Sequence, residues 1–307
     1  MSFKIYDLII IGAGPSGMTA AVYAARKKMD FIIISQDIGG QAAWSGDVEN
    51  YTGYQLISGP ELALKFQEHI KSFAVEVLMP ENVIRIKKQD DIIKVVTKRQ
   101  EHQSRSIIVA TGKRSRQLNV EGELEFKNKG LTYCATCDGP LFSDKHVAVI
   151  GGGNSALDAV LQLMKISPQV YLITRDMHLN ADAVMIEKVK AVANVEIVYG
   201  AEVVKIEGDV FVKNIEIRSK GKQTVLSVEG IFVEIGLMPN SEFAEVLSQN
   251  QKKEIVVDAH NRTSVPGIFS AGDVTNIPEK QIIIACGEGA KACLSAFRYL
   301  SMHKFRT

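Results

Sequence analysis

The stretch Tyr6-Asp-Leu-Ile-Ile-Ile-Gly-Ala-Gly-Pro-Ser-Gly17 indicates the fold of this 307-residue chain. Its apolar half leads into a glycine-rich turn, residues 18–28 are rich in alanine, and residues 31–35 are again apolar and β-branched. A buried strand, a glycine turn, a helix and a second strand follow one another in this way at the start of a dinucleotide-binding α/β domain.

Each glycine of this turn has its own reason to be glycine. Gly12 permits the tight turn from strand to helix, Gly14 lets a pyrophosphate approach the backbone, and Gly17 lets the helix pack closely on the sheet. Pro15 fits at the helix start because its missing N–H would have no partner there. Phosphates bound at such a turn lie at a helix N-terminus, where N–H groups and the helix dipole favour anions. The sequence therefore predicts a dinucleotide site here.

The same pattern of strand, glycine turn and helix occurs a second time. Residues 146–156 read His-Val-Ala-Val-Ile-Gly-Gly-Gly-Asn-Ser-Ala, and residues 157–174 continue as a predicted helix and strand. Gly151, Gly153 and Ala156 take the three motif positions, and alanine is an accepted variant at the third. Two turns predict two dinucleotides, a bound flavin dinucleotide and a nicotinamide dinucleotide that supplies hydride. A single site beside a decayed duplicate is the alternative, and the intact second motif argues against it.

Each unit is followed by alternating strands and then by a strand that ends in glycine, predicted over residues 106–112 and 230–236. The C-terminal stretch Gly267-Ile-Phe-Ser-Ala-Gly-Asp273 and a helix predicted over residues 283–300 complete the first unit rather than the second. We therefore predict an α/β fold of two Rossmann-like domains of the three-layer ββα type, the second inserted in the first. The outer domain is expected to comprise residues 1–117 and 242–307, and the inner domain residues 118–241.

The pair Cys134 and Cys137 is the strongest chemical signal in the chain. The spacing Cys134-Ala-Thr-Cys137 closes a small disulfide ring whose strain and surroundings make the bond easy to reduce and re-form. A zinc site needs two further ligands at a second knuckle, whereas Cys286 and Cys293 lack that spacing and no histidine cluster accompanies them. We therefore predict a redox-active pair and no metal. Asp138 could protonate a departing thiolate, or it could serve only as a turn or cap residue.

Composition and charge exclude several classes of protein. The formal net charge is +1, which gives no argument for binding to nucleic acid or to an acidic membrane. No apolar run approaches the ~20 residues of a membrane span, and residues 1–6 lack the layout of a signal peptide, so the expected location is the cytoplasm. Cys286 and Cys293 lie seven apart in an apolar segment. We expect them to be buried thiols on one helix face.

Taken in order, these motifs closely resemble the low-molecular-weight thioredoxin reductase family and the flavoprotein of the alkyl hydroperoxide reductase system. The stretches that carry the resemblance are Gly12-Ala-Gly-Pro-Ser-Gly17, Gly39-Gly-Gln41, Val48-Glu-Asn-Tyr51, Ala110-Thr-Gly112, Cys134-Ala-Thr-Cys-Asp138, Gly151-Gly-Gly-Asn-Ser-Ala156 and Ala271-Gly-Asp273. The resemblance implies FAD in the outer domain, NADH or NADPH in the inner domain, and a homodimer. It also implies thioredoxin or a similar small redox protein as the acceptor.

The resemblance assigns roles to individual residues. Cys137 would face the flavin, Cys134 would attack the disulfide of the partner protein, and Asp138 would be the proton donor. The expected contacts to FAD come from both chain ends, at Gly12, Gly14, Pro15, Gly17, Gln41, Asn50, Val83, Ala110, Thr111, Gly112, Gly272, Asp273, Gln281 and Ile282. The expected contacts to the nicotinamide dinucleotide are Gly151, Gly153, Asn154, Ser155, Ala156, Arg175 and Asp176.

The chain departs from the family pattern just after the second strand of the inner domain. Members that use NADPH carry a His-Arg-Arg run and a further arginine there, and these basic groups pair with the 2′-phosphate. Here only Arg175 remains, since Thr174, Asp176 and Asn180 replace the other three. Asp176 could accept hydrogen bonds from a free ribose 2′-OH and repel a phosphate, which favours NADH. Alternatively, Arg175 could hold NADPH weakly, or electrons could arrive from a protein such as ferredoxin.

Two later stretches, residues 230–240 and 280–291, resemble the peroxide-reducing branch, whose members use NADH. That branch usually carries an N-terminal thioredoxin-like extension, and because this sequence has none, its disulfide is expected to serve a separate protein. A flavin-binding redox sensor with little turnover is the rival from another class, but a sensor does not need a proton donor beside the cysteines. The sequence thus predicts a flavoprotein disulfide reductase, with donor and acceptor left open.

Overall fold

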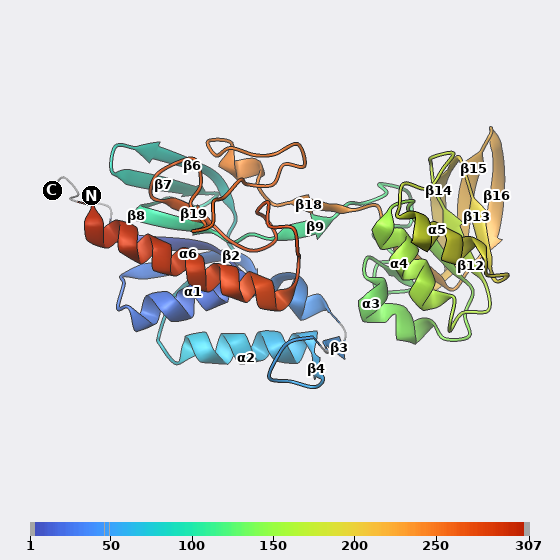
Figure 1. Ribbon diagram of the computed structural model, residues 1–307, viewed down its shortest axis with the longest axis horizontal. Helices are drawn as coiled ribbons and strands as arrows, with labels where there is room; N and C mark the ends of the chain where they lie inside the picture. Colours follow the sequence, from blue (N-terminus) through green and yellow to red (C-terminus); the bar gives the residue numbers. More distant parts are fainter. Residues whose placement is uncertain (1–3, 46, 49, 304–307) are drawn as a thin grey trace. The chain divides into compact units, whose positions relative to one another are not determined.

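The computed structural model describes residues 4–45, 47–48 and 50–303, and the chain divides into two compact units (Figure 1). Unit 1 comprises residues 1–114 and 238–307, and unit 2 comprises residues 115–237. The chain leaves unit 1 after residue 114 and re-enters it at residue 238, whereas the sequence predicts that the outer domain ends at residue 117 and resumes at residue 242. The strands at the two crossings, β9 (Lys113–Ser115) and β18 (Leu237–Pro239), pair with each other.

Unit 1 is built on a seven-stranded sheet with the order β5-β2-β1-β8-β7-β6, in which β19 also pairs with β8. The parallel strands are β1 (Ile5–Ala13), β2 (Phe31–Ile38), β5 (Glu76–Leu78), β8 (Glu101–Val109) and β19 (Ile268–Ser270), and the antiparallel hairpin is β6 (Val83–Gln89) with β7 (Ile92–Thr97). Strand β8 joins the antiparallel and the parallel parts of the sheet, because residues 101–104 pair with β7 and residues 107–109 pair with β19. It therefore begins and ends earlier than the sequence predicted.

Alternate residues of β1 face two different layers of unit 1. Leu8 and Ile10 pack in an apolar cluster with α1 (Pro15–Arg26) and α6 (Ile282–Met302). Ile9 and Ile11 pack in a second cluster with the β6–β7 hairpin. A strand that is buried on both faces reads as a continuous apolar run, which is why residues 8–11 show no alternation.

Helices α1 and α6 approach each other closely because small residues meet between them. A Cβ at Gly289 would lie only 2.0 Å from the carbonyl oxygen of Ser16. Cys286 and Cys293 lie buried and free on α6, as predicted. The other elements of unit 1 are α2 (Gly59–Lys71), the 3₁₀ helices η1 (Gly40–Trp44) and η3 (Glu242–Ala244), and the strands β3 (Asp47–Val48) and β4 (Ile57–Ser58).

Unit 2 repeats this layered plan around a five-stranded parallel sheet. Its strands, in spatial order, are β10 (Leu131–Thr132), β17 (Gly230–Val233), β11 (Val147–Ile150), β12 (Val170–Ile173) and β13 (Val195–Val198). A three-stranded antiparallel sheet packs on one face through β14 (Ala201–Gly208) and β15 (Val212–Ser219), which is followed by β16 (Lys222–Ser227). Helices α4 (Asn154–Leu163) and α5 (Ala183–Lys190) cover the other face. The predicted fold class of two Rossmann-like domains is confirmed.

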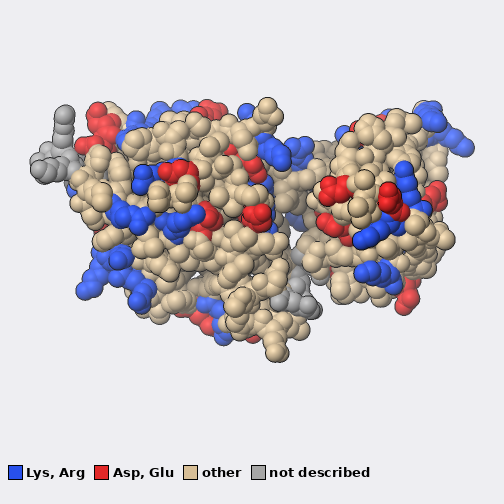
Figure 2. Space-filling model, in the orientation of Figure 1, with Lys and Arg blue, Asp and Glu red and all other residues tan. Residues whose placement is uncertain are grey.

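The surface carries charges of both signs. On the face drawn in Figure 2, basic and acidic side chains are interspersed rather than gathered into fields of one sign. This distribution agrees with the near-balance of charge in the whole sequence, +1 at neutral pH. No helix in the described part of the chain combines the length and the apolar character that a membrane span requires.

Candidate active site

The first glycine turn packs tightly at Gly12 and Gly17 and is open at Gly14. Gly12 has φ +107°, and a Cβ there would lie 2.4 Å from the carbonyl oxygen of Ala110. A Cβ at Gly17 would lie 1.8 Å from the carbonyl oxygen of Gly12. A Cβ at Gly14, in contrast, would have no heavy atom within 4 Å. Gly12 and Gly17 therefore permit packing within the protein, whereas Gly14 borders open space at the start of α1.

The open space at Gly14 suits an anionic group. Gly14 is the N-cap of α1 and provides no side chain to bond the first N–H groups of the helix. The buried Ser16 Oγ on the same turn has no hydrogen-bond partner among the described residues. Uncapped N–H groups beside a hydroxyl group that needs a partner fit the phosphates of a dinucleotide.

Asp273 lies in the turn after β19, close to the start of α1. A Cβ at the neighbouring Gly272 would lie 3.0 Å from Ser16 Cβ, so the two motifs meet although they are far apart in the sequence. Burial raises the pKa of Asp273, and the positive charges of Lys280 and Lys113 oppose this shift. A carboxyl group in such a position can accept a hydrogen bond from a hydroxyl group of a ligand.

Other residues predicted to contact FAD form hydrogen bonds that join distant segments of unit 1. Gln41 Nε2 donates to the carbonyl oxygen of Lys113 at 2.6 Å. Asn50 Nδ2 donates to Gln281 Oε1 at 3.0 Å, and Gln281 is the N-cap of α6. The loop after η1 is thereby tied to the start of α6, where the helix dipole is positive.

Asn240, the last residue of the stretch 230–240, also belongs to this region, although it was not among the residues predicted to contact FAD. Thr111 Oγ1 donates to the carbonyl oxygen of Asn240 at 2.6 Å, and Asn240 Nδ2 donates back to the Thr111 carbonyl at 2.8 Å. Asn240 N–H donates to the carbonyl of Gly112 at 2.9 Å. Val83 and Ile282, also predicted to contact FAD, pack against apolar clusters of unit 1.

A charged cluster in unit 1 was likewise missed from the sequence. Lys113 Nζ lies 2.6 Å from Glu254 Oε1, and Lys280 Nζ lies 3.4 Å from the same oxygen. Burial acts to raise the pKa of Glu254, but hydrogen bonds from Lys113 and Asn250 and the charge of Lys280 outweigh it and lower that pKa to about 2. Burial, followed by repulsion from Lys113, lowers the pKa of Lys280. The same two lysines act on Asp273, so the cluster sets the charge near the predicted FAD site.

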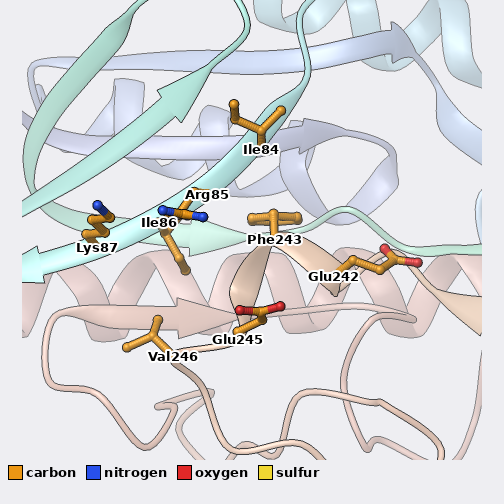
Figure 3. Close-up of a pocket in the computed structure, with 8 residues that line it drawn as sticks. All are labelled: Ile84, Arg85, Ile86, Lys87, Glu242, Phe243, Glu245 and Val246. Carbon is orange, nitrogen blue, oxygen red and sulfur yellow. The ribbon is translucent and has the colours of Figure 1, made fainter.

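A surface pocket of about 320 Å³ lies elsewhere on unit 1, between β6 and the segment around η3 (Figure 3). It is lined by Ile84, Arg85, Ile86, Lys87, Glu242, Phe243, Glu245 and Val246. None of these residues was predicted to contact FAD. The glycine turn and its partners, rather than this pocket, therefore define the candidate dinucleotide site of unit 1.

The second glycine turn, in unit 2, repeats the geometry of the first. Gly151 has φ +146°, and a Cβ there would lie 2.3 Å from the carbonyl oxygen of Glu234. A Cβ at Gly152 would lie 2.5 Å from Thr174 Oγ1. Gly153 is the N-cap of α4 and, like Gly14, supplies no capping side chain. A second uncapped helix start is therefore available for phosphates.

The residues that begin α4 divide between exposed and buried positions. Asn154 and Ser155 are exposed, whereas Ala156 is fully buried against the sheet. Asn154 Oδ1 accepts a hydrogen bond from Asp182 N–H at 2.9 Å, which ties the start of α4 to the start of α5. The small third residue of the motif therefore serves helix packing, as the sequence predicts.

The segment after β12 presents Arg175 and Asp176 at the surface. Asn180 Nδ2 donates to Asp176 Oδ2 at 2.8 Å, and Asn180 N–H donates to the carbonyl of Gly152 at 2.7 Å. The Asp176 carboxylate is thus held by a residue that is itself bonded to the second glycine turn. Asn180, which the sequence marked only as a lost arginine, fixes the acidic group of this site.

Cys134 is half-buried and disulfide-bonded, and it directly precedes the short helix α3 (Ala135–Asp138). Cys134 N–H donates to Thr132 Oγ1 at 3.2 Å, and the Thr132 hydroxyl donates to the carboxylate of Asp138. Asp138 N–H closes the turn on the Cys134 carbonyl at 3.1 Å, before the 3₁₀ helix η2 (Gly139–Phe142). The side chain of Cys137 lies outside the described part of the structure, so its pairing with Cys134 stays a prediction.

Glu234 is a further polar residue that contacts this turn, and sequence reasoning missed it. It follows β17, and its Oε1 accepts a hydrogen bond from Ala135 N–H at 3.3 Å. Burial raises the pKa of Glu234 to about 7, the bond from Ala135 opposes the shift, and the negative charge of Asp158 adds to it. The only signal for Glu234 in the sequence is a charged residue at the end of an otherwise apolar strand. Its nearness to the glycine turn at Gly151 is visible only in the structure.

Comparison with known proteins places this geometry among redox enzymes. The family model described as pyridine nucleotide-disulphide oxidoreductase matches residues 6–289. An NADH dehydrogenase of Ferdinandcohnia aciditolerans is 41% identical over 298 residues, which are 96% of this chain and 57% of that protein. One alkyl hydroperoxide reductase component, from Pseudomonas putida, is 39% identical over 310 residues, covering 97% of this chain and 58% of that protein. The chain thus spans less than two thirds of these curated relatives.

A solved structure matches nearly the whole chain. The crystal structure of thioredoxin reductase from Streptococcus pyogenes MGAS5005 has a TM-score of 0.82 and 36% sequence identity. The match covers 98% of this chain and 100% of that one. This likeness supports the fold described above.

Proposed function

Because this chain belongs to the pyridine nucleotide-disulphide oxidoreductases, a family that uses FAD and NAD(P)H, we propose that it reduces a thioredoxin-like protein with electrons from a nicotinamide dinucleotide. In this proposal the electrons reach the Cys134–Cys137 pair by way of FAD. The observation that carries it is the cysteine turn, in which a disulfide-bonded Cys134, Thr132 and Asp138 form one hydrogen-bonded set.

FAD would be held by residues from both ends of the chain. The uncapped start of α1 at Gly14, with Ser16 Oγ beside it, fits the pyrophosphate. Asp273 would accept a hydrogen bond from a hydroxyl group of the ligand, and Asn50 with Gln281 would contact its flavin end. When bound, FAD supplies the two-electron chemistry that connects a hydride donor to a disulfide.

NADH is the proposed donor. The uncapped start of α4 fits a second pyrophosphate, and the Asp176 carboxylate, fixed by Asn180, fits a ribose with a free 2′-OH. The 2′-phosphate of NADPH would meet that negative charge with only Arg175 to offset it. The name NADH dehydrogenase of the relative that is 41% identical supports the same donor.

Electrons would leave the protein by thiol–disulfide exchange. The Cys134 thiolate attacks one sulfur of the partner's disulfide, which forms a mixed disulfide and releases the partner's other sulfur as a thiolate. Cys137 then attacks Cys134, which re-forms the internal disulfide and releases the partner's second sulfur. Asp138, held by Thr132, protonates a departing thiolate in this proposal. We also propose, from the resemblance to thioredoxin reductases, a cytoplasmic homodimer.

Purified protein loaded with FAD tests these steps separately. Under anaerobic conditions we expect NADH to bleach the flavin absorbance at lower concentrations than NADPH. Cys134→Ser should keep this bleaching and lose reduction of a thioredoxin disulfide, whereas Cys293→Ser, the buried thiol on α6, should keep both. Retained turnover in Cys134→Ser contradicts the relay.

The same preparation distinguishes the rival functions. If neither nucleotide bleaches the flavin at millimolar concentration, the nicotinamide donor is wrong, and reduced ferredoxin becomes the donor to test. If the flavin is bleached but no protein disulfide is turned over, a redox sensor accounts better for the cysteine pair.

A further inference from the structure

Glu234 is a carboxyl group that the proposed electron route does not use, although it touches the cysteine turn. Its Oε1 accepts a hydrogen bond from Ala135 N–H, and Ala135 follows Cys134 directly. Its own carbonyl oxygen lies against Gly151 of the second glycine turn. One partly buried acid therefore contacts both the disulfide-bearing segment and the proposed nicotinamide turn.

The surroundings of Glu234 favour a proton on its carboxyl group near neutral pH. Strands β10 and β11, which flank β17, contain no ionisable residue. Asp158 on α4 acts on Glu234 by repulsion, and burial raises the pKa of Glu234 to about 7. On α3, the carboxylate of Asp138 is bonded by Thr132. The ionisable residues of β15, which also packs near β17, are Lys213, Glu216 and Arg218, and the two cations pair with Asp209 and Glu202.

Reduction of the Cys134 disulfide changes the charge of the segment to which this carboxyl group is hydrogen-bonded. The S–S bond accepts two electrons and breaks, one proton converts one sulfur to a thiol, and the other sulfur remains a thiolate. A new negative charge near a partly buried carboxylate raises its proton affinity. We propose that Glu234 takes up a proton when the Cys134 disulfide is reduced and returns it when the disulfide re-forms.

In this proposal, the protonation state of Glu234 is linked to the redox state of the cysteine turn. The inference rests on the proposed function, since it requires a disulfide that cycles. The two electrons come from reduced flavin in the enzyme and from a dithiol in the test below. If Glu234 only caps the backbone of the turn, its protonation does not change when the disulfide is reduced. Glutamine, whose amide oxygen also accepts from Ala135 N–H, would then give the same reduction equilibrium as wild type at every pH.

The test measures the fraction of Cys134 that is reduced in the full-length protein. Wild type and Glu234→Gln are equilibrated with a fixed ratio of reduced to oxidised dithiothreitol from about pH 6 to about pH 9. After an acid quench and alkylation, mass spectrometry of the Cys134 peptide gives the fraction reduced. The pH dependence of dithiothreitol is common to all variants and cancels in the comparison.

The direction of the expected pH dependence follows from the linkage between proton uptake and disulfide reduction. Below the pKa of about 7, Glu234 is protonated in both redox states, so the wild-type and Glu234→Gln curves are expected to run parallel. Above it, reduction of wild type takes up one more proton, so its equilibrium constant falls by up to about tenfold more per pH unit, or ~30 mV, until the pKa of the reduced form is passed.

Glu196→Gln is the matched control, because it removes the same charge from an exposed position on the edge strand β13. A steeper wild-type curve that Glu234→Gln loses and Glu196→Gln keeps supports the inference. Parallel curves for wild type and Glu234→Gln, or the same loss in both variants, overturn it. A Cys134 disulfide that dithiothreitol does not reduce at any pH in any variant overturns the proposed function itself.

Discussion

Replacing Gly14 by alanine should separate ligand binding from folding at the first glycine turn. Gly14 has φ −77° and ψ −177°, which alanine also adopts, and no heavy atom lies within 4 Å of its ideal Cβ. Alanine is a poorer N-cap than glycine by about 0.5–1 kcal/mol. It also restricts the unfolded chain, which stabilises the fold by about 0.4–1 kcal/mol. The two effects nearly cancel, so we expect the free energy of unfolding of the apoprotein to change by less than about 1 kcal/mol.

FAD binding should respond differently. A methyl group at position 14 would fill the space through which a phosphate reaches the N–H groups of α1. Loss of one hydrogen bond to a charged group costs about 1.5–3 kcal/mol, which weakens FAD binding by about 10- to 150-fold. Urea unfolding of the apoprotein and titration of FAD fluorescence measure the two quantities on the same sample.

Gly17→Ala is the contrasting control. Its Cβ would lie 1.8 Å from the carbonyl oxygen of Gly12, so the backbone must move and the fold should lose more than about 4 kcal/mol. If Gly14→Ala binds FAD as tightly as wild type, the phosphates do not approach this glycine and the assignment of the turn is refuted. If Gly14→Ala instead unfolds like Gly17→Ala, the open space described at Gly14 is wrong.

Three further predictions concern other parts of the two units. Thr132→Val removes the hydroxyl that joins Cys134 to Asp138, so turnover with a protein disulfide should fall about tenfold, whereas flavin bleaching by NADH in stopped-flow traces should not change. Asp176→Ala combined with Asn180→Arg should raise kcat/KM for NADPH by about tenfold or more relative to NADH, and an unchanged ratio would contradict the donor assignment. Glu254→Gln removes a carboxyl group whose pKa is about 2 in the fold against 4.5 normally, so its stabilisation is present above pH 4.5 and is lost as the pH falls toward 2. Between about pH 6 and about pH 3, wild type should therefore lose about 2 kcal/mol more stability than Glu254→Gln in urea unfolding, and equal losses would refute this linkage.

Local features of the sequence predicted most of the framework of the molecule. A glycine turn between a strand and a helix is specified by neighbouring residues, because positive φ and the absence of a Cβ are properties of single positions. The two turns at Gly12 and Gly151 could therefore be recognised, and so could the spacing of Cys134 and Cys137. The order of these motifs also indicated that one unit is inserted in the other.

The extent of strand β8 was harder to predict, because its two halves have different partners. Residues 101–104 pair with the antiparallel β7, whereas residues 107–109 pair with the parallel β19. The first half alternates between half-buried and buried residues, and the second half is buried throughout. A single pattern of burial does not describe such a strand, so only its continuous apolar half was recognised from the sequence.

Within the candidate site, the sequence by itself determined the residues whose role depends on backbone shape, and the tertiary structure decided which polar groups meet. Glu234 and Ala135 are 99 positions apart, Lys113 and Glu254 are 141 apart, and Asn50 and Gln281 are 231 apart. Periodicity reports which face of an element is buried, but it does not report which side chain of another element lies opposite. These contacts form only when segments far apart in the sequence pack together in the folded chain. For that reason, the charged groups around the cysteine turn and the glycine turns could be identified only from the structure.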